Sequence, residues 1–127
     1  MSPRQNDPAI SDDTVLWRAI PNSQVCRGDE GAERPESWAF LSDDNGVSAW
    51  IAAETDLQAL KARFPNSRIA EFTVGEAREY GNIAARDPVE GDASHVVICP
   101  TAGKPAKRVR KDARRLASKA RLLPREE

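Results

Sequence analysis

Hydrophobic and polar positions change along this chain in short blocks, and these blocks predict a series of strands and helices. Blocks rich in β-branched and aromatic residues favour strands, whereas apolar residues at steps of three and four favour helices. The predicted strands are residues 14–20, 37–41, 46–52, 68–74, 82–86 and 94–99, and the predicted helices are residues 55–64, 75–81 and 104–123. This order predicts an α+β fold, in which a small mixed or antiparallel sheet is packed against helices.

The connections between these blocks complete the predicted organisation. The dipeptide Asn45-Gly46 is a strong hairpin signal when strands flank it, so residues 37–52 are expected to form a hairpin. The polar, Gly- and Glu-rich residues 24–36 predict a long loop. We expect residues 1–13 to form a flexible arm and residues 14–127 to form a single domain.

The last predicted helix is both amphipathic and basic. Pro105 suits its first turn, and Pro124 marks its end. Its apolar residues recur at steps of four and three, which places them on one face of the helix. They are Ala102, Ala106, Val109, Ala113, Leu116, Ala120 and Leu123. Because most of them are alanines, this inner face allows a close approach to whatever it covers.

Charge is divided unevenly along the chain, although the net charge is only −1 at pH 7. Residues 104–127 carry ten bases and three acids, a net of +7, and residues 1–103 carry nine bases and seventeen acids, a net of −8. The basic helix can lie along the acidic body, so that the two charges compensate each other. Alternatively it faces outward and binds a polyanion, since basic side chains release condensed counterions from phosphates. The sequence leaves both interpretations open.

The outward-facing interpretation identifies a set of polyanion-binding residues. They are Lys107, Arg108, Lys111, Arg114, Arg115 and Lys119. Their spacing lets several of them meet one row of phosphates, so the expected partner is a nucleic acid or an acidic protein. Aromatic residues are absent from this stretch, so binding should be largely independent of base sequence and strongly salt-dependent. Large apolar residues are too few for deep insertion into a membrane surface.

Composition narrows the class of protein further. The longest apolar runs are too short to span a membrane, and the polar N-terminus is not a secretory signal. Cys26 and Cys99 do not make a disulfide framework, and together with His95 they lack the spacing of a zinc site. We therefore expect a cytoplasmic, non-catalytic binding or accessory module without a metal. A subunit of a larger assembly, docking through the final helix, is an alternative.

Two residues are candidates for chemistry. Arg18 lies between Leu16 and Ile20 on one face of its predicted strand, so its charge must reach solvent, pair with an acid or bind an anion. His95 is the only histidine and lies near the start of a strand that is predicted to be buried. It is either an acid/base or ligand-contacting group or a hydrogen-bonded structural residue. No strong enzymatic motif accompanies either residue.

One combination of residues resembles a known family. It consists of Arg18, a loop with Gly31 and Arg34-Pro35, Phe40, and the strand of residues 46–52 followed by a helix. Over residues 14–64 this order resembles the front half of small RES-type, ADP-ribosyltransferase-like bacterial proteins.

The resemblance implies a second possible function, an NAD-handling enzyme or toxin built around Arg18, Ser48 and His95. In that case Arg18 holds a phosphate, and Ser48 or Ser37 borders the nicotinamide ribose. Residues 59–62 contain no acid where the family carries one, so the resemblance implies NAD binding more directly than catalysis.

Overall fold

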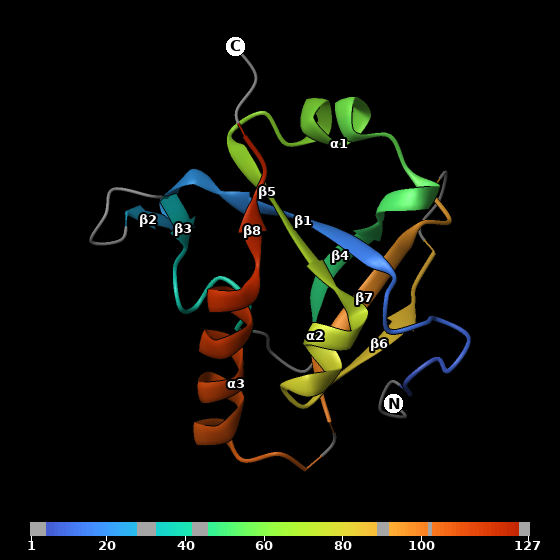
Figure 1. The fold of residues 1–127 in the computed structure, drawn as a ribbon, viewed down its shortest axis with the longest axis vertical. Coiled ribbons are helices and arrows are strands. Elements are labelled where there is room, and N and C mark those ends of the chain that lie inside the picture. Colours follow the sequence, from blue (N-terminus) through green and yellow to red (C-terminus); the bar gives the residue numbers. More distant parts are fainter. Residues whose placement is uncertain (1–4, 28–32, 42–45, 89–91, 102, 125–127) are drawn as a thin grey trace.

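The computed structural model describes residues 5–27, 33–41, 46–88, 92–101 and 103–124, which form an α+β fold (Figure 1). Six strands pair antiparallel in the order β6-β7-β4-β1-β5-β8, and β2 and β3 form a separate two-stranded ribbon. The strands are β1 (Val15–Pro21), β2 (Val25–Arg27), β3 (Glu33–Pro35), β4 (Val47–Ile51), β5 (Ser67–Thr73), β6 (Asn82–Arg86), β7 (His95–Pro100) and β8 (Arg121–Leu122). The helices are α1 (Leu57–Arg63), α2 (Val74–Glu79) and α3 (Ala106–Lys119), with 3₁₀ turns at Asn22–Gln24 and Ala52–Glu54. The predicted α+β class is confirmed, and of the two predicted sheet types the sheet is the antiparallel one.

Helices cover both faces of the large sheet, because its central strands are apolar on both sides. On β1, Leu16 points to one face and packs in the larger hydrophobic cluster, to which α2 and α3 contribute. The next residue, Trp17, points to the other face and contacts the smaller cluster, which includes Trp50 of β4 and Leu60 of α1. Helix α1 therefore covers the face opposite to α2 and α3.

The predicted hairpin of residues 37–52 is wrong. Strand β4 lies inside the sheet between β1 and β7, and residues 37–40 form a turn instead of a strand. Phe40 and Ala39 are buried in this turn, and the Ala39 carbonyl accepts hydrogen bonds from the Arg18 guanidinium at 3.1 and 3.3 Å. A short apolar run fits a buried turn as well as a strand, so periodicity alone did not separate the two.

The long loop predicted for residues 24–36 is also partly wrong, because its described ends are the paired strands β2 and β3. Glu33 on β3 accepts a hydrogen bond from Arg68 on β5 at 2.6 Å, which ties the ribbon to the large sheet. Residues 28–32, which contain the glycine of the family resemblance, and residues 42–45 of the predicted hairpin turn lie outside the described residues.

Helix α3 is shorter than the predicted helix of residues 104–123, since it ends at Lys119. Ala120 is extended, with φ −67° and ψ 145°, and leads directly into β8, which pairs with β5. Leu122 packs against the larger cluster and Leu123 against the smaller one, on the opposite face of the sheet. Neighbouring residues on opposite faces are the period of a strand, so the end of the predicted helix becomes an edge strand.

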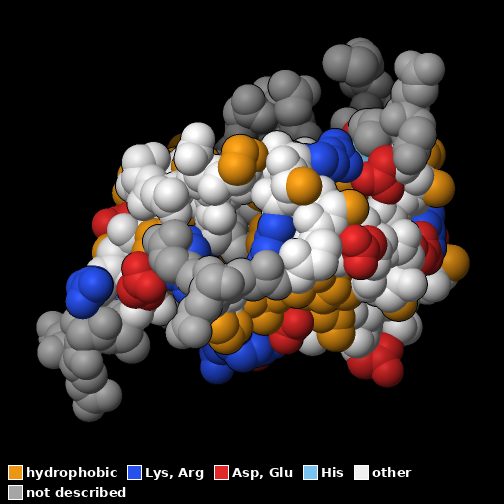
Figure 2. Space-filling model, turned by 90° about the horizontal axis from the view of Figure 1, so that it is seen from above, with side chains coloured by type: hydrophobic (Ala, Val, Ile, Leu, Met, Phe, Trp, Pro, Cys, Tyr) orange, Lys and Arg blue, Asp and Glu red, His pale blue; other side chains and the backbone are white. Residues whose placement is uncertain are grey.

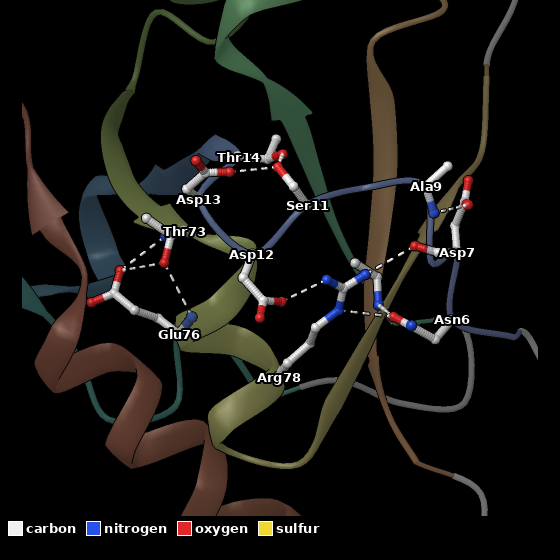
Figure 3. A network of polar contacts seen from close by, with 11 residues as sticks. Asn6, Asp7, Ala9, Ser11, Asp12, Asp13, Thr14, Thr73, Glu76 and Arg78 are labelled. Atoms are coloured by element: carbon white, nitrogen blue, oxygen red, sulfur yellow. Dashed lines mark hydrogen bonds and ion pairs between the residues drawn. The ribbon is translucent and has the colours of Figure 1, made fainter.

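The N-terminal segment, expected to be a flexible arm, lies against α2 and β6 in residues 5–13 (Figure 3). Arg78 on α2 donates hydrogen bonds to Asn6 Oδ1 at 3.0 Å, to Asp12 Oδ1 at 2.7 Å and to the Asp7 carbonyl at 2.9 Å. Ile10 is buried in the larger cluster. Arg78, the buried Ile10 and backbone hydrogen bonds, from the Asp7 amide to the Ala84 carbonyl at 2.8 Å and from the Gly75 amide to the Asp12 carbonyl at 2.7 Å, thus hold this segment to the body of the protein.

Candidate functional site

The cationic side chains of α3 point away from the body of the protein. The buried residues of α3 are Asp112, Ala113, Leu116 and Ala117, and they form a narrow inner stripe that packs toward the sheet. The outer residues are exposed and almost all cationic: Lys107, Arg108, Arg110, Lys111, Arg114, Arg115 and Lys119. The cations thus lie on the outer side of this helix, but the buried face differs from the expected one, since Ala106 is exposed and Asp112 is buried.

The acids of the body do not neutralise these outer cations in the described part of the chain. There, Arg108 is the only one of the seven in an ion pair, with its Nε 3.5 Å from Asp112 Oδ2 on the same helix. Asp112 is buried against Lys104, whose Nζ lies 2.6 Å from Oδ2, outside hydrogen-bond geometry. Lys104 donates its hydrogen bonds to the carbonyls of Gly81, at 2.7 Å, and Tyr80, at 3.4 Å. The charge of the outer row therefore remains available.

A groove of about 370 Å³ lies between α3 and the turn at residues 37–41. Lys107, Arg110, Lys111 and Arg114 line it from the helix, and Ser37, Trp38 and Leu41 line it from the turn. The four helical residues are spaced by three, one and three positions, which places them on one face of α3. The groove therefore combines a row of four cations with a partly apolar wall.

Trp38 is exposed because the next two residues of the turn point inward. The Trp38 side chain is 48% exposed, whereas Ala39 and Phe40 are buried. The Phe40 ring meets the Phe72 ring edge to face, with 5.2 Å between centroids. The Leu41 amide donates to the Trp38 carbonyl at 3.0 Å and closes the turn. The half-exposed Trp38 side chain thereby lines the groove.

The structure places the six predicted polyanion-binding residues in two groups. Lys107, Lys111 and Arg114 line the groove, and Arg108, Arg115 and Lys119 lie elsewhere on the exposed surface of α3. Sequence reasoning did not assign the other four residues to the groove, Arg110 on the helix and Ser37, Trp38 and Leu41 on the turn. Arg110 could have been found from its spacing to Lys107 and Arg114, whereas Trp38 is distant in sequence from the helix.

The surface seen in Figure 2 differs from the groove in its charge pattern. Lys and Arg side chains are mixed there with Asp, Glu and hydrophobic side chains, and no patch of one sign dominates this face. Helix α3 runs toward the opposite end of the molecule in Figure 1. The mixed charges of this face contrast with the row of cations on α3.

A second pocket, of about 330 Å³, lies where β1, β4 and β7 approach the end of α1. Its lining residues are Arg18, Ala19, Ser48, Trp50, Arg63, Phe64 and His95. It contains Arg18, Ser48 and His95, the three residues that the family resemblance groups together. The structure thus brings these side chains to one place, while their role in handling NAD stays a prediction.

The Arg18 guanidinium is held by backbone carbonyls, and the anion-binding role expected for it stays a prediction. Its guanidinium donates to the Ser48 carbonyl at 3.1 Å and to the Ala39 carbonyl through two nitrogens, and it lies 5.8 Å from the Phe40 ring centroid. No carboxylate pairs with it among the described residues. Burial lowers the pKa of Arg18 to about 10, because desolvation disfavours the charged form.

His95 is buried at the start of β7, beside Trp50 of β4. Its Nδ1 lies 2.7 Å from the Asp87 carbonyl and 3.5 Å from Asp87 Oδ2. A carbonyl only accepts hydrogen bonds, so Nδ1 carries the proton in the neutral ring and Nε2 is left as an acceptor. The Trp50 ring meets the imidazole edge-on, with 5.2 Å between centroids.

The described residues contain no group of three or more His, Cys, Asp and Glu side chains that could hold a metal ion. Cys26 is half-buried on β2 and Cys99 is buried on β7, so the two cysteines belong to different sheets. No helix in the described ranges has the length and apolar character needed to cross a membrane. Comparison of the chain with models of known protein families, with curated proteins and with solved structures finds no match.

Proposed function

We propose that this protein binds single-stranded nucleic acid in the groove between α3 and residues 37–41. The observation that supports this most directly is the placement of an exposed indole, Trp38, beside a row of cations without acidic partners in the described part of the chain. Proteins that bind single strands combine these two elements, a positive track for the backbone and aromatic rings for the bases.

The helical row matches the dimensions of a phosphate backbone. From Lys107 to Arg114 the helix rises about 10 Å, at about 1.5 Å per residue. A stacked strand places one phosphate per about 3.4 Å, so the row spans about three phosphates. Arg110 and Lys111 lie between these two ends on the same face. Long side chains on one face of a helix can therefore follow one strand.

Trp38 favours a single strand over a duplex. A duplex presents phosphates and groove edges, while the flat faces of its bases are stacked on each other. A single strand can turn a base toward the indole, and such stacking contributes about 1–3 kcal/mol per base. Leu41, 42% exposed beside the indole, supplies an apolar contact for the same base.

An acidic protein is the competing partner, since it would use the cations of α3 and leave Trp38 without a stacking role. Fluorescence anisotropy with a labelled oligothymidine, a duplex of equal length and an oligoglutamate separates the partners. We expect the oligothymidine to bind most tightly and to weaken as salt rises from about 50 to 200 mM. Tighter binding of the oligoglutamate than of either nucleic acid would assign the groove to an acidic protein.

The groove itself is tested by Lys111→Gln combined with Arg114→Gln. Loss of two single-strand phosphate contacts should reduce the slope of log affinity against log salt by about 1.4. The matched control is Arg115→Gln with Lys119→Gln, which removes the same charge from the same helix outside the groove. Equal losses in both double variants would show that only the total charge of α3 matters and would contradict a groove-bound strand.

A further inference from the structure

The second pocket lies at an opening within the large sheet. Strands β1 and β5 pair over seven residues, but β1 and β4 pair only at Leu16↔Ile51 and Trp17↔Trp50. Beyond this point the Arg18 guanidinium bridges the two strands, since it donates to the Ser48 carbonyl of β4 at 3.1 Å. A charged side chain therefore connects β1 and β4 at a point where a continuous β-ladder would join them by backbone hydrogen bonds only.

The charge of Arg18 has no counterion in the described part of the chain. Its three hydrogen bonds all go to neutral backbone carbonyls, those of Ala39 and Ser48. A guanidinium has five N–H donors, so two are left after these three bonds. Removing a cation from water without an opposite charge is costly, and an anion in the adjoining pocket would offset that cost.

A second arginine lines the rim of the same pocket. Arg63 at the end of α1 has a side chain that is 49% exposed, and its Nη1 lies 3.0 Å from Asp92 Oδ2. Its guanidinium lies 5.5 Å from the ring centroids of both Trp50 and Phe64. The pocket therefore has one cation at its inner side, one at its rim and aromatic walls between them.

Two polar atoms of the pocket complete this arrangement. No hydrogen bond to a described residue uses His95 Nε2 or Ser48 Oγ, whereas the other ring nitrogen of His95 is held by the Asp87 carbonyl. Ser48 and His95 are diagonal neighbours on the paired strands β4 and β7, because Ser48 pairs with Val97 and Trp50 pairs with His95. An acceptor and a hydroxyl thus lie on one wall.

We infer that this pocket binds a small organic anion, a carboxylate or a phosphate monoester, with its charged group toward Arg18 and Arg63. Its apolar part contacts Phe64 and Trp50, and His95 Nε2 and the Ser48 hydroxyl are available to its remaining polar atoms. The volume of about 330 Å³ is near the lower end of the range for ligand pockets, which favours a small acid over a dinucleotide. This site is separate from the groove and does not depend on nucleic-acid binding.

The single histidine provides a direct readout, because its ring proton signals are unique in an NMR spectrum. The full chain is titrated with phenyl phosphate, benzoate, inorganic phosphate and benzyl alcohol. We expect a saturable shift of the His95 signals with phenyl phosphate, benzoate or both, and at least tenfold weaker effects with inorganic phosphate and benzyl alcohol. A response to only one of the two aromatic anions identifies the charged group that the pocket accepts.

Variants connect the response to the pocket. Arg63→Gln should weaken binding at least tenfold, whereas Arg86→Gln, an exposed arginine that pairs with Glu54 outside the pocket, should leave it unchanged. Ser48→Ala should also weaken binding, without removing a charge. Neither variant alters Arg18, so the test does not depend on whether an Arg18 variant folds. The inference is overturned if no probe gives a saturable shift up to about 10 mM, where a Kd of about 1 mM would be evident. Equal binding of inorganic and phenyl phosphate, or equal effects of the two arginine variants, would also overturn it.

Discussion

In our proposal the exposed Trp38 side chain stacks on a base of the bound strand, and a substitution at this position tests that contact. Replacing it with alanine removes the stacking platform, so affinity for oligothymidine should fall by about 1–3 kcal/mol, or about 5- to 150-fold. The salt slope should not change, because no phosphate contact is lost. Anisotropy titrations at several salt concentrations measure both quantities.

The control for this substitution is Trp50→Ala. Trp50 is buried, so its removal should lower stability by about 3–5 kcal/mol, whereas removal of the half-exposed Trp38 should cost far less. Urea unfolding compares the two variants. If Trp38→Ala kept full affinity for oligothymidine, stacking would have no part in binding.

The buried pair of Lys104 and Asp112 is the second residue-scale feature with a measurable effect. Asp112→Asn would leave the Lys104 ammonium, whose side chain is 9% exposed, without an opposite charge. Breaking a buried pair in this way costs about 3–5 kcal/mol, which urea unfolding should detect. Arg108→Gln is the control, because Arg108 is 60% exposed and its contact with Asp112 is 3.5 Å long. We expect that control to change stability by less than about 1 kcal/mol.

At the scale of elements, the sequence predicted what each segment is more reliably than where it ends or pairs. The strands predicted at residues 68–74 and 94–99 appear as β5 and β7 with ends shifted by one residue. The helix predicted at residues 55–64 appears as α1, whose N-cap is Asp56. In each of these segments the local pattern and the tertiary environment favour the same structure.

The errors arose where a distant partner decided the outcome. Arg18 takes the Ala39 carbonyl away from any hairpin ladder, and the edge of β5 recruits the residues after Lys119 into β8. For the same reason, only the helical side of the groove could be predicted from the sequence. The spacing of Lys107, Lys111 and Arg114 can be read along one helix, but the approach of Trp38 depends on the tertiary fold.

The attachment of the N-terminal segment to α2 also belongs to this scale. Arg78→Ala removes three hydrogen bonds to that segment, and the Asn6 side chain, which also accepts from the Ala84 amide at 3.2 Å, loses its neighbour (Figure 3). We expect faster hydrogen exchange at the Ala84 amide and faster proteolysis near Ile10. Arg86→Gln, whose arginine pairs with Glu54, is the control. Unchanged exchange at Ala84 would show that Arg78 is not needed to hold the segment, which Ile10 and the backbone hydrogen bonds of Asp7 and Asp12 would then retain.

At the scale of the whole molecule, the uneven distribution of charge predicts an unusual response to salt. The outer cations of α3 repel one another without acidic partners in the described residues, apart from the Arg108 contact with Asp112. Raising ionic strength from about 0.01 to 0.15 M shortens the screening length from about 30 to 8 Å. The unfolding temperature should therefore rise, by about 4 °C if the relieved repulsion is about 1 kcal/mol.

A variant with fewer cations on α3 tests whether repulsion between these cations causes the salt response. Lys111→Gln with Arg114→Gln removes two of the repelling charges and should reduce the increase in unfolding temperature, as measured by circular dichroism. A fall in unfolding temperature with salt would mean that the acidic body stabilises the basic helix, which is the compensating interpretation left open by the sequence.

The fixation of α3 at both ends has a consequence for recognition. Just before its start Lys104 donates to the carbonyls of Gly81 and Tyr80 and contacts Asp112, and at its end Ala120 passes directly into a strand of the sheet. The backbone of the helix is thus already fixed to the body of the protein before any ligand binds. Association has to immobilise only a few long side chains, at about 0.5–1.5 kcal/mol each, and no segment has to fold first.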